Sequence, residues 1–235
     1  MKNDRRQRTE IIRVGKLLHQ RAYVAATDGN ISVRLDRDRV LVTPTGMCKG
    51  MMAAGDLVTV DMRGRKLGGR RSVSSEVGMH LQIYSLRPDV KAVVHAHPPT
   101  ATGYAAAGMA LNQALVSEIV LALGCVPLAK YATPGTRELS AELAPLIPEY
   151  DAILMANHGV VTYGEDLLRA YMNMETVEHF ARIALVTHLL GREQPLGEEE
   201  VRGLMVAREK YESENSGSAA PRSPVVRGRR AFPQR

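Results

Sequence analysis

The stretch AVVHAHP, residues 92–98, combines an apolar run with two histidines and a proline that ends it. Its first five residues are typical of a buried strand, and Pro98 breaks the strand because proline has no backbone N–H to donate. His95 and His97 stand two positions apart at the end of this run. Because side chains alternate between the two faces of a strand, both imidazoles are expected to project from the same face.

A third histidine lies in the sequence Asn157-His158-Gly159, between strand-like segments at residues 152–155 and 159–162. Three imidazoles at strand ends can converge on one point and leave a fourth coordination position open, which is the arrangement of a catalytic zinc site. Neutral ligands leave the ion its full charge, so it is a stronger Lewis acid than in a thiolate site. The pattern alone leaves two simpler interpretations open, namely an incidental His-x-His pair and an ordinary tight turn.

The chain mixes strand-like and helical segments, without an internal repeat and without a linker before residue 213. This mixture predicts a single α/β domain at residues 1–212. Thr133 is the expected N-cap of a helix that ends at residue 143, and residues 63–73 are expected to form a basic loop.

Four further histidines in helical segments are interpreted as surface or half-buried helix residues: His19, His80, His179 and His188. Helices are expected at residues 5–26, 74–86, 100–108, 116–124, 134–143, 165–190 and 197–211, and strands at residues 31–35, 40–43, 57–62, 92–96, 125–129, 152–155 and 159–162.

The sequence Ser74-Ser75-Glu76 opens one of these helices and allows two interpretations. Serine at an N-cap with glutamate in the first turn is ordinary helix capping. Paired hydroxyls and free N–H groups at a helix N-terminus also form a phosphate cradle, beside which Glu76 can reach a metal or a substrate carbon as an acid/base. Two turn clusters, at residues 27–30 and 43–46, supply further amides and hydroxyls.

Composition excludes several classes of protein. The 235 residues, of 25.7 kDa, are 45% hydrophobic and 24% charged, which suits one large soluble domain. Aromatic residues are only 4%, which argues against stacking platforms for single-stranded nucleic acid. No apolar run approaches the ~20 residues that span a bilayer, and no secretory signal follows the N-terminus. Cys48 and Cys125 do not suggest a disulfide framework, so we expect no membrane location and a reducing, cytoplasmic compartment.

The net charge of +6 is concentrated at the two ends of the chain. Residues 1–16 hold six basic and two acidic residues, and residues 217–235 hold five arginines and no acid, so the residues between them are slightly acidic overall. The C-terminal segment is rich in Pro, Gly and Ser, and residues 213–235 are therefore predicted to be a basic, disordered tail. A solvated extension is favoured over nucleic-acid binding, which is expected to amount at most to weak contacts of the tail.

Six short motifs, in this order, resemble the class II aldolase/adducin family and in particular its L-fuculose-phosphate aldolases. The resemblance covers about residues 5–210. The motifs are Gly29-Asn30-Ile31-Ser32, Thr43-Pro44-Thr45-Gly46, Ser74-Ser75-Glu76, His95-Ala96-His97-Pro98, Tyr131-Ala132-Thr133-Pro134-Gly135-Thr136 and Asn157-His158-Gly159.

The resemblance implies a central, mainly antiparallel sheet between helical layers, and a homotetramer with active sites near the subunit interfaces. It implies that His95, His97 and His158 bind one Zn²⁺ per subunit. Glu76 is implied to be the catalytic acid/base and a further zinc ligand while the substrate site is empty. The implied substrate-phosphate site consists of Gly29, Asn30, Thr45, Gly46, Ser74 and Ser75.

The implied activity is zinc-dependent cleavage of a short ketose 1-phosphate, similar to fuculose 1-phosphate or a deoxy-pentulose 1-phosphate, to dihydroxyacetone phosphate and an aldehyde. A related sugar-phosphate 4-epimerase or a methylthioribulose-1-phosphate dehydratase is the alternative. A non-catalytic adducin-type module is disfavoured, because it has no reason to keep three ligand histidines and a carboxylate. The fuculose-phosphate enzymes carry a tyrosine in the segment that matches residues 115–119, where this chain has Leu-Val-Ser-Glu-Ile. Glu118 and Tyr211 are candidates for its role, and each is equally well explained as a helix-surface residue.

Overall fold

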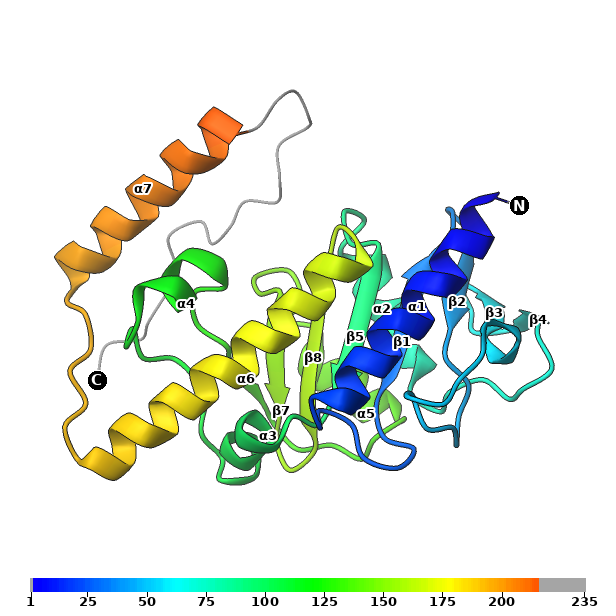
Figure 1. Cartoon of the computed structure of the whole chain (residues 1–235), viewed down its shortest axis with the longest axis horizontal. Helices are drawn as coiled ribbons and strands as arrows, with labels where there is room; N and C mark the ends of the chain where they lie inside the picture. Colours follow the sequence, from blue (N-terminus) through cyan, green and yellow to red (C-terminus); the bar gives the residue numbers. More distant parts are fainter. Residues whose placement is uncertain (1, 216–235) are drawn as a thin grey trace.

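An eight-stranded sheet forms the centre of the protein, in the order β4-β3-β2-β1-β5-β8-β7-β6 (Figure 1). The computed structural model describes residues 2–215, so the expected tail at residues 213–235 lies mostly outside the described residues. Every neighbouring pair of strands is antiparallel except β6 and β7, which are parallel. The strands are β1 (Asn30–Arg34), β2 (Arg39–Val42), β3 (Val58–Asp61), β4 (Lys66–Gly68), β5 (Ala92–Ala96), β6 (Leu128–Ala129), β7 (Ala152–Met155) and β8 (Gly159–Gly164).

Helices cover both faces of this sheet (Figure 1). Helices α1, α3 and α6 contribute to one apolar core, which includes Val94 and Met174, and helices α2 and α5 contribute to a second core, which includes Val93 and Leu139. The helices are α1 (Lys2–Gln20), η1 (Ala54–Asp56), α2 (Val77–Leu86), α3 (Pro99–Ala106), α4 (Ser117–Ala122), α5 (Arg137–Leu143), α6 (Leu167–Leu190) and α7 (Glu198–Asn215). The predicted fold class, a single α/β domain with a mainly antiparallel sheet between helical layers, is confirmed. Among the described helices, none combines the length and the apolar character needed to cross a bilayer.

Strand β5 lies inside the sheet, between β1 and β8, and all five of its residues are buried. Its side chains alternate, so that Val94 enters the core under α6 while Val93 enters the core under α2. By the same alternation His95 projects from the face that carries Val93, and it is completely buried. A candidate metal ligand thus stands in a fully buried part of the fold.

Two helices begin later than predicted. Helix α2 begins at Val77, and its N-cap is Glu76 rather than Ser74, whose carbonyl instead accepts the Val77 N–H in a turn. Helix α5 begins after Thr136, whose side chain accepts a backbone N–H three residues later, so the predicted N-cap Thr133 is wrong.

Other boundaries also differ from the prediction. Helix α1 stops at Gln20 rather than at residue 26, since Ala22 adopts a left-handed φ of 58°. The segment at residues 63–73 is not all loop, because it contains the edge strand β4. The strand expected at residues 125–129 is reduced to β6, and Val126 forms a separate bridge with Leu111.

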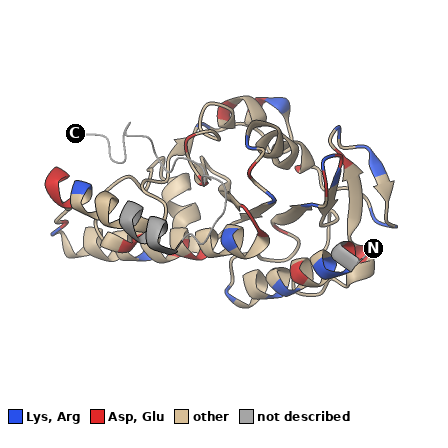
Figure 2. Ribbon diagram, turned by 90° about the horizontal axis from the view of Figure 1, so that it is seen from above, with Lys and Arg blue, Asp and Glu red and all other residues tan. Residues whose placement is uncertain are grey.

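The basic residues of α1 lie among acidic ones (Figure 2). Arg8 pairs with Asp4 at 2.9 Å, and Arg13 pairs with Glu10 at 2.8 Å. Exposed pairs of this kind contribute at most about 1 kcal/mol each to stability. Their effect here is to break up the positive charge of the N-terminal helix, so α1 does not present a uniformly basic face.

Replacement of the α6 cap tests the described helix start. The Asp166 carboxylate accepts the Arg169 N–H at 2.7 Å, so Asp166→Ala is expected to lower the free energy of unfolding by about 1 kcal/mol. Glu165→Ala is the matched control, because Glu165 is exposed and lies outside the cap. Chemical denaturation of both variants measures the difference, and equal stabilities would contradict the capping role.

Candidate metal centre

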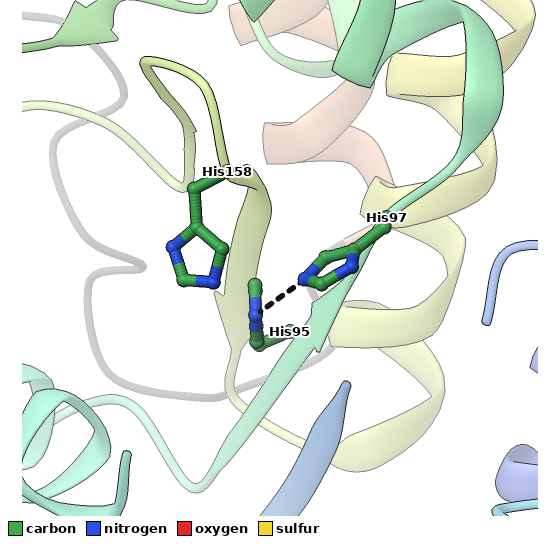
Figure 3. Close-up of side chains that lie close together, drawn as sticks. All are labelled: His95, His97 and His158. Atoms are coloured by element: carbon green, nitrogen blue, oxygen red, sulfur yellow. Dashed lines mark hydrogen bonds between the residues drawn. The ribbon is translucent and has the colours of Figure 1, made fainter. Parts of the chain in front are cut away.

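Three histidines meet where β5, β7 and β8 run side by side (Figure 3). His95 is the fourth residue of β5, His97 directly follows that strand, and His158 lies in the turn between β7 and β8. Pairing of Ala96 with Val160 places this turn beside the end of β5. One ligand atom of each ring lies within 4.8 Å of the others, and the ring centroids are 4.7, 4.9 and 5.2 Å apart. The predicted convergence is therefore present, while the role of the imidazoles as ligands stays a prediction.

Two glycines permit this close approach of side chains and backbone. A Cβ on Gly159 would lie 2.5 Å from Cδ2 of His97, and a Cβ on Gly29 would lie 2.6 Å from the carbonyl oxygen of His95. Asn157, with a φ of 55°, makes the turn before His158. The sequence Asn-His-Gly is thus a tight turn that also carries a candidate ligand, so the two interpretations of this motif are compatible.

Hydrogen bonds behind the rings orient their inner nitrogens. His95 Nδ1 lies 2.9 Å from the Val160 carbonyl oxygen, which can only accept, so Nδ1 carries the proton and Nε2 presents a lone pair to the centre. His97 Nδ1 faces a carboxylate oxygen of Asp28 at 3.4 Å, which favours the same tautomer. The two Nε2 atoms are 3.1 Å apart, a distance at which two lone pairs repel each other. A divalent cation held by both nitrogens removes that repulsion, so this donor set fits a metal ion.

Burial keeps two of these imidazoles in the neutral form. Burial lowers the pKa of His95 to about 3, although the Glu76 carboxylate opposes this change. Burial and the neighbouring His158 lower the pKa of His97 from its ordinary value. Both rings are therefore neutral at pH 7 and can bind a metal without first losing a proton.

Glu76, at the N-cap of α2, directs its carboxylate to the same centre. Its Oε1 lies 3.2 Å from His158 Nε2, and its Oε2 lies 3.5 Å from His95 Nε2. Asn30 Nδ2 donates a hydrogen bond to Oε2 at 2.7 Å. Burial opposes ionisation, but hydrogen bonds from His158 and from the Asn30 amide hold the pKa of Glu76 below its ordinary value. The carboxylate is thus ionised and close enough to the imidazoles to share a metal ion with them.

The turn at residues 43–46 lies against the segment that leads into α2. A β-bridge joins Pro44 to Val73, and the Thr45 N–H donates to the Ser72 carbonyl at 3.2 Å. Thr45, Gly46 and Ser75 are exposed and Ser74 is half-buried, so their polar groups are accessible from solvent. This adjacency is what a common phosphate site requires, and the phosphate role itself stays a prediction.

Lys49, which the sequence motifs did not include, connects two of the predicted turns. Its side chain is 1% exposed, and its Nζ donates to the carbonyl oxygens of Thr27 at 2.8 Å and Met47 at 2.6 Å. Burial lowers the pKa of Lys49 from its ordinary value. A lysine in a polar segment is normally solvated, so only the folding of both turns around it reveals this role.

Asn30 and His80 occupy different places from those expected. The amide of Asn30 is engaged by protein groups on both sides, with Nδ2 donating to Glu76 and Oδ1 lying 2.5 Å from His80 Nε2. His80 is only 2% exposed, so its interpretation as a surface or half-buried helix residue is wrong. The spacing of Glu76 and His80 along α2 was the available signal, since residues four apart share a helix face.

Substitution of Gly159 tests whether the triad binds metal as a unit. The added methyl group of Gly159→Ala would displace His97, so we expect metal affinity to fall about 10- to 100-fold. Gly103→Ala is the matched control, because a Cβ at Gly103 in α3 meets nothing within 4 Å. Zinc titration against a competing chelator measures both affinities. Equal affinities would show that the metal binds elsewhere.

The chain resembles known proteins over most of its length. The class II aldolase and adducin N-terminal domain matches residues 9–185. The chain is 35% identical over 190 residues to 3-oxo-tetronate 4-phosphate decarboxylase of Pectobacterium atrosepticum, covering 79% of this chain and 87% of that protein. It is 32% identical over 182 residues to L-fuculose phosphate aldolase of Methanococcus maripaludis, covering 77% and 98%. A solved structure of L-fuculose 1-phosphate aldolase matches with a TM-score of 0.80 and 34% identity, covering 87% of this chain and 95% of that one. The chain therefore belongs to the class II aldolase and adducin family, whose enzymes depend on a metal.

Proposed function

We propose that this chain is a zinc-dependent lyase that cleaves a carbon–carbon bond beside the carbonyl of a short keto-phosphate and releases dihydroxyacetone phosphate. The observation that carries the proposal is the convergence of His95, His97 and His158 with the Glu76 carboxylate. Three imidazoles suit zinc well, although cobalt, manganese and iron also accept such ligands.

In this proposal the three imidazoles hold the metal through their inner nitrogens, and Glu76 is a further ligand before substrate binds. When bound, the divalent cation stabilises the negative charge that develops on the carbonyl and hydroxyl oxygens of the substrate, by several kcal/mol. The enclosure of His95 within the sheet fixes the position of that charge-stabilising centre.

The phosphate group of the substrate anchors the end that does not react. Thr45, Gly46, Ser74 and Ser75 present hydroxyl and N–H groups from adjacent turns. Gly29 and Asn30 are proposed members of the same site, with the Asn30 side-chain amide already bonded to Glu76 and His80. Binding of the phosphate at this anchor orients the reacting bond of the substrate. The substrate therefore loses much of its translational and rotational freedom on binding, before the chemical step.

Glu76 exchanges the proton in the reaction. When the bond between C3 and C4 of a ketose 1-phosphate breaks, its electron pair stays with C3. An aldehyde leaves as the C4 hydroxyl loses its proton, which the ionised Glu76 carboxylate takes up directly or through water. The resulting enediolate then takes a proton at C3 from Glu76, which yields dihydroxyacetone phosphate. Removal of a proton from the same carbon by the carboxylate starts the reverse condensation.

Decarboxylation is a second candidate, favoured by a specific observation. In a 3-oxo-tetronate 4-phosphate, loss of CO₂ from C2 leaves the same enediolate, and no hydroxyl proton has to be removed. The segment at residues 115–119 has no tyrosine to assist with that proton, and Glu118 is exposed in the first turn of α4. The similarity to a protein named as such a decarboxylase supports the same candidate.

A substrate panel separates these reactions. Fuculose 1-phosphate, a deoxy-pentulose 1-phosphate, methylthioribulose 1-phosphate, ribulose 5-phosphate and 3-oxo-tetronate 4-phosphate are incubated with zinc-loaded protein, and dihydroxyacetone phosphate is measured. We expect its release from one ketose 1-phosphate with an aldehyde, or from the oxo-acid with CO₂. Chelation and His97→Ala should each reduce release to background, whereas His179→Ala, at an exposed position of α6, should not.

Products other than dihydroxyacetone phosphate would contradict the lyase. An epimer of ribulose 5-phosphate without cleavage would indicate a 4-epimerase, and loss of water from methylthioribulose 1-phosphate would indicate a dehydratase. Turnover that persists in metal-free His97→Ala protein would exclude the metal centre from the reaction altogether.

We also propose that the chain acts in the cytoplasm as a homotetramer. The C-terminal part of α6 exposes apolar side chains that an assembly would cover, including Leu189 at 75% and Leu190 at 71%. Sedimentation equilibrium is expected to give four times the chain mass of 25.7 kDa. A mass of one chain at micromolar concentration would contradict the assembly.

A further inference from the structure

A chain of buried hydrogen bonds leads from the core to Glu76. His80 lies at its centre: Nδ1 is 2.7 Å from Ser32 Oγ, and Nε2 is 2.5 Å from Asn30 Oδ1. On one side, Ser32 Oγ is 2.7 Å from the Tyr84 hydroxyl. On the other side, Asn30 Nδ2 donates to Glu76 Oε2 at 2.7 Å. We call these five residues the Glu76 support chain.

The support chain arises from two matching periodicities. Glu76, His80 and Tyr84 are spaced by four residues and lie along one face of α2, starting at its N-cap. Asn30 and Ser32 are spaced by two residues and project from one face of β1. Packing of this helix face on this strand face buries polar groups from both elements, and each group finds its partner in the other element.

Chemistry determines the direction of every bond in the support chain. The Glu76 carboxylate only accepts, so the amide of Asn30 must turn its NH₂ group toward Glu76 and its oxygen toward His80. That oxygen also only accepts, so His80 Nε2 carries the proton and Nδ1 accepts from the Ser32 hydroxyl. The Ser32 oxygen then accepts from Tyr84. One tautomer of His80 and one orientation of Asn30 satisfy all four bonds.

We infer that His80 is a positioning residue that holds Glu76 through Asn30, and the inference rests on the proposed function because it concerns Glu76 as the proton carrier. When the Asn30 amide is held in one orientation, its Nδ2 keeps Glu76 Oε2 in place. Glu76 Oε1, which lies 3.2 Å from His158 Nε2, then faces the histidine triad. If His80 lost its Nε2 proton donor, the Asn30 amide could rotate and present its oxygen to the carboxylate, which would repel Glu76 from the reacting carbon.

Exchange of solvent deuterium into C3 of dihydroxyacetone phosphate measures the Glu76 step alone. The carboxylate removes one C3 proton, the proton is replaced from D₂O, and a deuteron returns to the same carbon, so NMR follows the exchange without the second product. His80→Leu removes both hydrogen bonds of the ring, and we expect the exchange rate at saturating substrate to fall about 100-fold. KM and zinc content should stay near those of the unaltered protein, since the phosphate turns and the triad are unchanged.

His80→Gln is the conservative variant, because its side-chain N–H can still donate to Asn30, and it should retain most of the exchange rate. Tyr163→Phe is the control for loss of a buried polar group, since the Tyr163 hydroxyl donates to the backbone carbonyls of Tyr150 and Ile147 and not to the support chain. If His80→Leu does not fold, Ser32→Ala replaces it, because loss of the Ser32 donor frees the His80 tautomer. Exchange in the folded variant equal to that of Tyr163→Phe would overturn the inference.

Nitrogen-15 NMR of His80 in the zinc-loaded protein gives an independent readout without substrate. We expect the neutral Nε2–H tautomer in the unaltered protein, and a proton on Nδ1 would overturn the inference. Absence of exchange in the unaltered protein would instead disprove the proposed function, so the two failures are distinguishable.

Discussion

The antiparallel pairing of β5 with β8 is the constraint on which the site depends. It sets Ala96 opposite Val160, and it thereby brings the turn before β8 to the end of β5. His95 in β5, His97 directly after it and His158 in a turn more than 60 positions later in the chain meet only because of this register. A slip by one residue would turn His95 to the opposite face of the sheet, away from His158. The convergence of the three histidines is thus a property of the sheet rather than of any local motif.

Burial gives the site its chemical character, and hydrogen bonds orient His95 and Glu76 within it, whereas His158 Nδ1 is buried without a hydrogen-bond partner among the described residues. His95 lies in the sheet with no exposed surface, which favours the neutral imidazole, and the Val160 carbonyl fixes its tautomer. Buried polar groups are stabilising only when they are satisfied, and then they favour one arrangement over its alternatives. The Glu76 carboxylate is enclosed in the same way, between the triad on one side and Asn30 on the other.

Local sequence patterns predicted those features that depend on residues close together in the chain. The two-residue period of β5 was sufficient to place His95 and His97 together. The mixture of segments predicted an α/β domain, whereas the mainly antiparallel sheet between helical layers followed from the family resemblance. The starts of α2 and α5 were not predictable from composition, because several neighbouring residues have side chains suited to an N-cap. The Thr136 hydroxyl caps α5, whereas the Glu76 side chain makes no capping hydrogen bond to α2. The position of His80 depends on the packing of α2 against β1. A single sequence indicates this packing only when the four-residue spacing along α2 is compared with the two-residue spacing along β1. The leaving group of the proposed reaction, CO₂ or an aldehyde, was not predictable from residues 115–119, because this segment has no tyrosine and no spacing that is typical of either reaction.

X-ray absorption at the zinc edge tests the central claim most directly. Protein reconstituted with one equivalent of zinc per chain should show three imidazole nitrogens at about 2.0–2.1 Å, with the remaining position filled by oxygen. A sulfur scatterer at about 2.3 Å would place the zinc at a cysteine, and fewer than three imidazoles would mean that the triad does not act as one site. Either result would contradict the account.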